Sequence, residues 1–226
     1  MALMRRVVVT GLGPVAPNGI GAEAFHKAQL LGKSGIRRIT QFDASNYPVQ
    51  IAGEVEVNPE EYIDKRELRR LDRFTQLALI AGHLALQDAG LELEKEDHTR
   101  IGTLIGTGIG GMITWQEQSK VLFEKGGTRL SPFFIPMMTA NMASGQLAMK
   151  YGLMGPSSTV VTACATGSDA IGNAFRVIQL GEADVMLTGG TEAVVTEMAI
   201  GSFGGMRAVS TRNHETQQTN RPFNKR

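Results

Sequence analysis

The chain has 226 residues, of which 42% are hydrophobic and 20% are charged, and its formal net charge is +1. This balance is typical of a globular protein and supplies no overall basic field, so we expect no nucleic-acid partner. The single cysteine excludes an internal disulfide and a cysteine-based metal cluster, and it favours a reducing, cytoplasmic setting. No stretch has the length of a membrane span, so we expect no membrane partner.

The first part of the chain predicts one strand, two helices and a region of turns. Residues 7–10 are β-branched and uninterrupted, which predicts a buried strand. Apolar spacing over residues 21–31 predicts a helix, and residues 34–58 are expected to form turns and short strands. Residues 71–89 predict a helix that is apolar almost all round its middle and ends at Gly90. Such a helix is normally packed between other layers.

Strands and helices alternate in the rest of the chain. Residues 101–105 predict a strand, which a glycine cluster and a helix over 112–123 follow. Further elements are expected as a helix over 141–151, a buried strand over 159–162, a helix over 165–180 and a strand over 185–188. This order predicts an α/β fold with a parallel or mixed sheet and helices on both faces. No composition break marks a linker, so we expect one domain over residues 1–226.

The segment around Cys164 has the pattern of a nucleophile on a sharp turn. A β-branched strand runs into small residues and then into a helix, with the cysteine at the corner. Unpaired N–H groups at the start of a helix favour a thiolate and can bind the oxyanion that forms when a thioester is attacked. A buried, inert thiol remains the alternative, since most free cysteines pack as small hydrophobic residues.

Several motifs, taken together, resemble one family over the whole chain. The segment Thr162–Gly167 is similar to the nucleophile motif of the β-ketoacyl-acyl-carrier-protein synthases, which belong to the thiolase-like superfamily. Other motifs follow in the order of that family: 6–13, 106–111, 131–134, 141–142, 151–156, 181–184, 189–193 and 207–213. Within the family, the chain most resembles the bacterial elongating enzymes of the synthase II type.

This resemblance implies a fold and a reaction. The fold would be the N-terminal half of a five-layer α-β-α-β-α architecture with a mixed sheet. The reaction would be a decarboxylative Claisen condensation in fatty-acid elongation, in which an acyl group on Cys164 is joined to malonyl-ACP. Ile109, Phe134 and Phe203 match residues that line the acyl pocket, although each could equally be a core residue. The family forms homodimers and is expected to need neither a metal nor another cofactor.

The same resemblance implies that part of the machinery lies outside these residues. The family uses two histidines and a lysine from its second half for decarboxylation. His26, His83, His98 and His214 match none of those positions, so we interpret them as structural or solvated. The segment 221–223 resembles the family's Arg-Pro-Phe motif. We therefore expect that residues 1–226 alone do not catalyse condensation, although Cys164 could still be acylated.

A group of arginines suggests a site for the acidic acyl carrier protein. Arg66, Arg69, Arg70 and Arg73 recur at helical spacing, so their guanidinium groups could share one helix face. The resemblance implies carrier-protein binding by Arg66, Arg69, Arg70, Arg129 and Arg207. The alternative is a solvated helix face, which is what most charge runs form.

Two other functions remain to be weighed. Gly106-x-Gly108-x-x-Gly111 and Gly11-x-Gly13-x-x-Ala16 both follow predicted strands, as in dinucleotide-binding oxidoreductases, but neither leads to an acidic residue at the end of a next strand. A non-catalytic subunit of a condensing pair would resemble a synthase but would lack the cysteine. The presence of Cys164 therefore favours the enzyme.

Overall fold

The computed structural model describes residues 5–221 and residue 223, and these form two compact units. The first unit joins the N-terminal segment up to Gly13 to Asn58–Ala193, and the second joins Pro14–Val57 to the described residues from Val194 onward. Pro222 and Asn224–Arg226 lie outside the described residues, so the centre of the predicted Arg-Pro-Phe motif does too.

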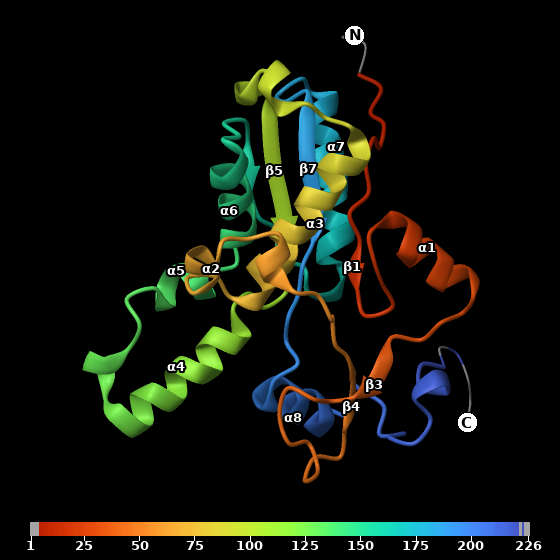
Figure 1. Ribbon diagram of the computed structural model, residues 1–226, viewed down its shortest axis with the longest axis vertical. Helices are drawn as coiled ribbons and strands as arrows, with labels where there is room; N and C mark the ends of the chain where they lie inside the picture. The colour runs from red at the N-terminus through yellow and green to blue at the C-terminus, as the bar shows by residue number, and fades with distance from the viewer. Residues whose placement is uncertain (1–4, 222, 224–226) are drawn as a thin grey trace. The chain divides into compact units, whose positions relative to one another are not determined.

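The first unit is built round a three-stranded parallel sheet of order β6-β5-β7 (Figure 1). Thr103 of β5 pairs with Ser157 on one side and with Leu187 on the other. The strands are β5 (Ile101–Gly106), β6 (Ser157–Ser158) and β7 (Val185–Gly190). All six residues of β5 are buried, as expected for a parallel strand that is covered on both faces.

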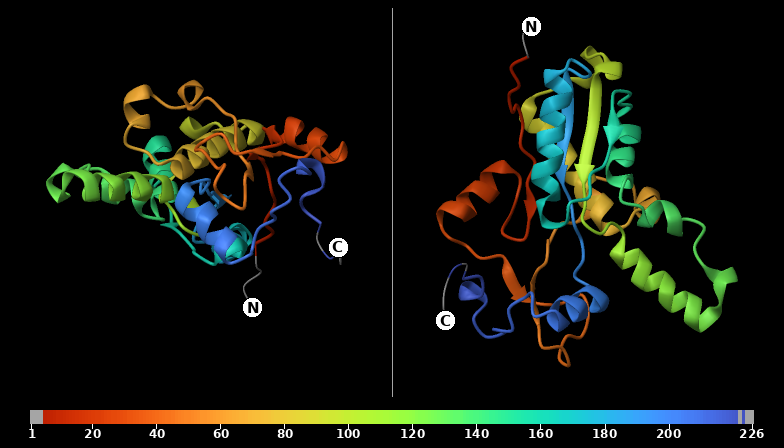
Figure 2. Two further views of the ribbon diagram at one scale, coloured as in Figure 1. Left: turned by 90° about the horizontal axis from the view of Figure 1, so that it is seen from below. Right: turned by 180° about the vertical axis from the view of Figure 1, so that it is seen from behind.

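Helices cover both faces of this sheet, which gives the unit three layers (Figures 1 and 2). One face carries α7 (Thr166–Gln179), whose Ala170 and Ala174 pack on Leu104 in the core. The other carries α3 (Arg73–Ala89) and α6 (Met142–Tyr151). The unit also contains α2 (Lys65–Leu68), α4 (Met112–Lys125) and α5 (Phe134–Met138).

The sequence explains where α3 begins, ends and packs. Asp72 caps its N-terminus by accepting a hydrogen bond from Phe74 N–H, and Gly90 ends it in the left-handed conformation, with φ of 62°. Gly82 lies where an added β-carbon would be only 2.5 Å from Leu147 of α6, so a glycine allows the two helices to approach. The predicted helix over 71–89, with its end at Gly90, is confirmed.

The second unit consists of two small hairpins and two helices. Strand β1 (Val15–Ala16) pairs antiparallel with β2 (Gly19–Ile20), and β3 (Ile36–Arg38) pairs antiparallel with β4 (Ile51–Gly53). The helices are α1 (Ala22–Leu30) and α8 (Glu197–Gly205). The buried carboxylate of Glu54 accepts hydrogen bonds from the N–H and the hydroxyl of Thr40, which joins the residue after β4 to the start of the β3–β4 connection.

The predicted strand over residues 7–10 is wrong. This segment joins none of the described sheets, and the residues that follow it lie on α3, where Leu12 N–H donates to Asp88 Oδ2 at 2.8 Å. Val8 and Val9 are 60% and 77% exposed. The residues directly after it are held on a helix, which offers no free row of N–H and C=O groups for a ladder.

The predicted strand over residues 159–162 is also wrong. Pairing with β5 stops at Ser158, because Ile105 O accepts the hydroxyl of Thr159 instead of a backbone N–H. The chain then leaves the sheet, and Val161 is 57% exposed. The other predicted helices and strands over residues 21–188 are present within a few residues of their expected bounds.

Candidate active site

Three loops meet at the carboxyl ends of the parallel strands. The segment 107–111 follows β5, residues 159–165 follow β6, and Thr191–Glu192 follows β7. An added β-carbon at Gly106 would lie 2.1 Å from Thr166 Cγ2, and one at Gly108 would lie 3.6 Å from Ala163 O. This edge is where ligands bind in open α/β sheets.

Cys164 stands on a tight turn between the end of β6 and the start of α7. Its side chain is exposed, so the alternative of a buried, inert thiol is not supported by the structure. The turn is a single 3-10 turn over Ala163–Ala165, and Ala163 has φ of 51°, in the left-handed region that non-glycine residues rarely adopt. A sharp, strained turn of this kind projects one side chain outward.

Thr166 closes this turn from inside the protein. Thr162 N–H donates to Thr166 Oγ1 at 2.9 Å, and the Thr166 hydroxyl donates to Ala163 O at 2.6 Å. The side chain is buried, and its methyl group fills the space that Gly106 leaves by having no side chain.

Glu192 holds the glycine loop beside the turn. Its carboxylate accepts from the hydroxyl of Thr107 and from Gly108 N–H, both at 2.8 Å. Thr107 Oγ1 in turn accepts from Gly110 N–H at 3.1 Å. The loop is therefore tied at three points between β5 and α4.

The three predicted acyl-pocket residues lie on different elements. Ile109 is at the tip of the glycine loop and is 41% exposed. Phe134 is the first residue of α5, and an added β-carbon at Gly111 would lie 2.7 Å from Met138 Cα at the end of that helix. Ile109 and Gly111, which contacts the end of α5, therefore belong to the same glycine loop of the first unit. Phe203 is half-buried in α8 of the second unit.

The predicted arginine face requires a correction. Arg66 lies in α2, but α2 ends at Leu68 and α3 begins at Arg73, so these residues do not share one helix face. The helix is interrupted because Asp72 adopts an extended conformation, with φ of −67° and ψ of 158°, in order to cap α3.

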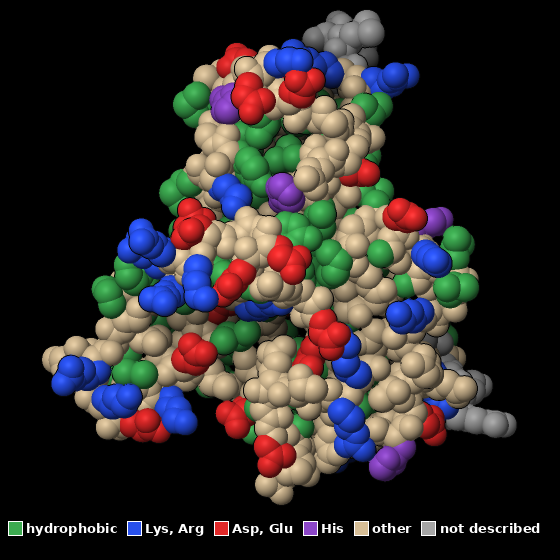
Figure 3. Space-filling model, viewed as in Figure 1, with side chains coloured by type: hydrophobic (Ala, Val, Ile, Leu, Met, Phe, Trp, Pro, Cys, Tyr) green, Lys and Arg blue, Asp and Glu red, His purple; other side chains and the backbone are tan. Residues whose placement is uncertain are grey.

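The arginines nevertheless gather on one region of the first unit. Arg66, Arg69 and Arg70 are exposed, and the guanidinium carbon of Arg70 lies 4.8 Å from the ring centre of Phe133. Figure 3 shows lysine and arginine side chains over the region of α2 and α4. Arg129 is exposed in the turn after α4, and Arg207 follows α8 in the second unit with φ of 56°.

Two of the histidines have structural partners away from Cys164. His83 Nδ1 lies 3.4 Å from the hydroxyl of Tyr151. Both ring nitrogens of His98 face carbonyl groups, those of Gly152 and Leu93, and these contacts raise the pKa of His98. The structural interpretation of these two histidines therefore has direct support in their contacts.

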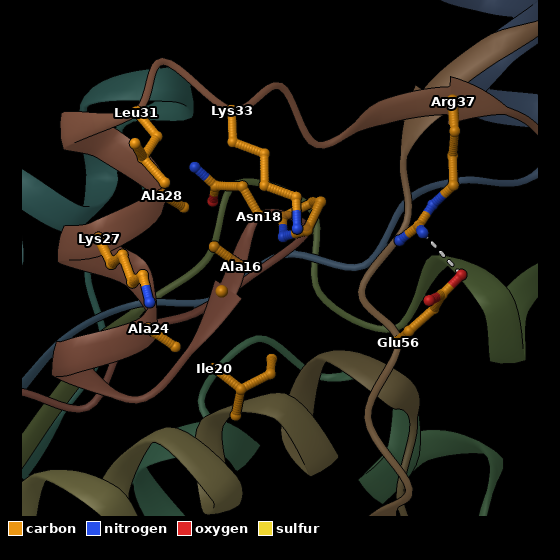
Figure 4. A pocket seen from close by; sticks show the side chains of 12 residues that line it. Ala16, Asn18, Ile20, Ala24, Lys27, Ala28, Leu31, Lys33, Arg37 and Glu56 are labelled. Carbon is orange, nitrogen blue, oxygen red and sulfur yellow. Dashed lines mark ion pairs between the residues drawn. The ribbon is translucent and has the colours of Figure 1, made fainter.

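A cavity of about 400 Å³ lies within the second unit (Figure 4). Lys27, Lys33 and Arg37 line it, together with apolar side chains of α1 and β2. Figure 4 shows Arg37 directed toward Glu56, with which it forms an ion pair of 2.6 Å, and both lysines are exposed. None of the predicted site residues lines this cavity.

Metal ligands and membrane helices were sought among the described residues. No group of three or more His, Cys, Asp or Glu side chains could hold a metal ion in residues 5–221 and 223. Within that same part of the chain, no helix is both long and apolar enough to cross a membrane.

Two residues of the site and one helix cap were missed by sequence reasoning. Thr166 and Glu192 both lie in motifs of the resemblance, but nothing in the motifs indicated that their side chains bond backbone groups of neighbouring loops. The missed cap is Asp72, which lies within the arginine run. The cap that it supplies to α3 could have been predicted, because an Asp directly before an apolar helix is a typical N-cap.

Solved structures define the class of protein. The chain superimposes on a β-ketoacyl synthase from Burkholderia phymatum with a TM-score of 0.83 and 28% identity, over 98% of this chain and 55% of that one. The ishigamide ketosynthase/chain length factor gives a TM-score of 0.84 and 29% identity, over 90% and 51%. A type II polyketide ketosynthase in complex with its acyl carrier protein gives 0.78 and 27%, over 89% and 55%. The fold is that of the thiolase-like ketosynthases, as predicted.

Sequence comparison then fixes the family. The family model for the β-ketoacyl synthase N-terminal domain matches residues 4–225, and the chain belongs to this family. It is 46% identical to 3-oxoacyl-[acyl-carrier-protein] synthase 2 of Staphylococcus aureus over 99% of its length, and 45% identical to the Synechocystis enzyme of that name over 98%. The chain spans about half the length of these relatives, 54% and 53%.

Proposed function

We propose that the protein is a 3-oxoacyl-[acyl-carrier-protein] synthase of fatty-acid elongation, an acyltransferase, and that residues 1–226 act as its N-terminal synthase domain. Two observations support this proposal. The curated relatives carry this name at 46% and 45% identity. Cys164 is exposed on a strained turn at the carboxyl edge of the sheet.

The first chemical step is transfer of an acyl group to Cys164. The thiolate attacks the carbonyl carbon of an acyl thioester, the tetrahedral intermediate collapses, and the carrier thiolate leaves and takes a proton. The acyl group is then held as a thioester on Cys164. We propose that N–H groups at the turn and at the start of α7 stabilise the negative charge that develops on the carbonyl oxygen. Ile109, Phe134 and Phe203 line the acyl pocket in this proposal.

The second step is condensation with malonyl-ACP. Loss of carbon dioxide from the malonyl group leaves a carbanion, which attacks the thioester on Cys164 and releases the cysteine thiolate and a 3-oxoacyl product. The histidine pair and lysine that support this step are expected from the part of the relatives that lies beyond the matched half. We therefore propose condensation for the whole protein and acylation for the site described above. Neither step calls for a metal or another cofactor.

The partners follow from the same chemistry. The carrier protein docks at Arg66, Arg69, Arg70, Arg129 and Arg207, and one of the similar solved structures contains a type II polyketide acyl carrier protein in complex with its ketosynthase. We also propose a homodimer in the cytoplasm, since the family forms homodimers and the one cysteine of the chain suits a reducing compartment.

The exposure of Cys164 on its strained turn carries the proposal, and its acylation provides the test. The purified protein gains the mass of one acyl group on incubation with acyl-ACP, and Cys164→Ala gains none. Intact-mass spectrometry measures both. An adduct that persists in Cys164→Ala, or a wild-type protein that gains no mass, would contradict the assignment.

The non-catalytic partner subunit is the second candidate, and one similar structure is named as a ketosynthase/chain length factor. The exposed thiol of Cys164 favours the catalytic role. The glycine loop after β5 does not support the dinucleotide-binding alternative, because the next strand in sequence, β6, ends at Ser158 and not at an acidic residue.

A further inference from the structure

We propose that Thr166 is a positioning residue for Cys164, and that its hydroxyl holds the turn in the conformation that acyl transfer requires. This inference rests on the proposed function and adds a residue to it. Ala163, the residue directly before the nucleophile, has φ of 51°. An alanine in this region costs about 1–2 kcal/mol relative to its ordinary conformations. The surrounding structure must therefore supply contacts that keep it there.

The contacts come from one hydroxyl group. Thr166 Oγ1 accepts from Thr162 N–H and donates to Ala163 O, so it bonds the backbone on both sides of the strained Ala163. The two bonds measure 2.9 and 2.6 Å, and Thr166 is only 4% exposed. Water therefore has little access to replace the hydroxyl if it is removed.

The position of Thr166 is fixed in turn by the sheet. Its methyl group packs against Gly106 at the end of β5, where any β-carbon would collide with it at 2.1 Å. Gly167 lies against Gly190 at the end of β7, with 3.6 Å between an added β-carbon and Gly190 Cα. The first turn of α7 is thus fixed between the ends of two strands. The hydrogen bonds of Thr166 hold the cysteine turn against it.

The reaction needs this turn to be fixed and not merely exposed. Acyl transfer requires the thiolate and the oxyanion donors to be aligned on one carbonyl group, and a displacement of about 1 Å costs up to about 100-fold in rate. Alkylation by iodoacetamide requires only an accessible thiol. The two reactions of Cys164 therefore report separately on alignment and on exposure.

The experiment compares Thr166→Val, Thr166→Ser and a matched control in the full-length protein. Valine keeps the shape of threonine but removes the hydroxyl, and serine keeps the hydroxyl but removes the methyl group. Thr188→Val makes the same chemical change in β7, where the hydroxyl donates to Leu104 O and bonds no part of the turn. All variants are tested below their melting temperatures.

Thr166→Val should acylate about 10- to 100-fold more slowly than the wild type, with the rate of alkylation within about threefold. Thr166→Ser and Thr188→Val should acylate within about threefold of the wild type. Unchanged acylation in Thr166→Val, or equal losses in acylation and alkylation, would overturn the inference, because neither result separates alignment from exposure.

Hydrogen exchange keeps the inference testable if the proposed function fails. The amide of Thr162 is protected by its bond to Thr166 Oγ1. It should exchange at least about tenfold faster in Thr166→Val and at the wild-type rate in Thr166→Ser. A wild type that is not acylated rejects the proposed function alone. Equal exchange of the Thr162 amide in wild type and Thr166→Val rejects only the role of Thr166. Where Thr162 is not resolved singly, the exchange of a peptide spanning 160–168 is compared instead.

Discussion

At the scale of single residues, the carboxylate of Asp72 joins two helices that are distant in sequence. Its Oδ1 caps α3 through Phe74 N–H, and its Oδ2 accepts from both the N–H and the hydroxyl of Thr114, at 2.8 and 2.6 Å. Thr114 is the third residue of α4, whose own N-cap, Gly111, has no side chain to offer. Burial raises the pKa of Asp72, and the hydrogen bonds from Thr114 and Phe74 oppose that rise.

Removal of this carboxylate should therefore be more damaging than removal of one donor. Asp72→Ala leaves three buried donors unpaired and should lower the free energy of unfolding by about 2–3 kcal/mol. Thr114→Val removes one donor and should cost about 1 kcal/mol. Urea denaturation of the two variants and the wild type measures the difference. Equal costs would show that Asp72 does not cap both helices.

At the scale of elements, the N-terminal segment packs on α3 through two glycines. An added β-carbon would lie 2.3 Å from Ala85 O at Gly11 and 2.0 Å from Ala81 O at Gly13. Both neighbours are backbone atoms of a helix, which cannot rotate away as a side chain could. Nearer the N-terminus, Arg5 bonds Asp184, which Arg100 also bonds, and the two arginines lower the pKa of that carboxyl to about 2.

The substitution Gly13→Ala should force this segment away from α3. The expected loss is about 1–3 kcal/mol in the free energy of unfolding, as for other overpacked sites. Gly145→Ala is the matched control, because Gly145 lies inside α6 with open space where the β-carbon would go. Alanine there should be neutral or stabilising by up to about 1 kcal/mol. Thermal and urea unfolding of both variants test the contrast, which a neutral Gly13→Ala would refute.

The helices were the elements that sequence predicted best, and the reason is local. The apolar period of α3 and both of its caps are encoded by consecutive residues, from Asp72 to Gly90. The wrong strands were both β-branched runs, at 7–10 and 159–162. Whether such a run becomes a strand depends on a partner elsewhere in the chain: the first pairs with none of the described strands, and the second loses its partner where Thr159 bonds Ile105 O.

The candidate site likewise combines features that a local sequence pattern encodes with contacts between distant residues, which no local pattern encodes. Cys164 was proposed from sequence because small residues and the start of a helix are adjacent there, although the β-branched run before them leaves the sheet after Ser158. The bond between Glu192 and Gly108 spans 84 residues, and the fit between Thr166 and Gly106 likewise joins distant parts of the chain, so no local pattern encodes either. The helix break at Asp72 was missed because four arginines at helical spacing suggested one continuous helix.

At the scale of the whole molecule, the net charge is close to zero, so attraction to an acidic partner must come from a local surface. Arg66 and Arg69 are exposed, and neither forms an ion pair with any residue that the structure describes. Such side chains act mainly on the rate of association, and their effect weakens with salt.

Reversal of these charges should slow docking of the carrier protein. Arg66→Glu combined with Arg69→Glu should raise the apparent KM for acyl-ACP about tenfold or more at low salt, and the difference should shrink as salt increases. Lys27→Glu with Lys33→Glu changes the net charge equally in the second unit and serves as the control. Kinetics at several salt concentrations provide the measurement. The same KM change in both double variants would point to net charge and not to the patch.

The buried strand β5 has a consequence for how the protein is made. Its neighbours in the sheet begin at Ser157 and Val185, so β5 leaves the ribosome long before either one. At about 5–20 residues per second, its apolar residues wait on the order of 4–17 s for β7 to be synthesised. During that time a largely apolar strand is open to pairing with other nascent chains. Slower codons between β5 and β7 should therefore increase the fraction of protein that is lost to aggregation. A chaperone that holds the emerging chain should restore the yield of folded protein.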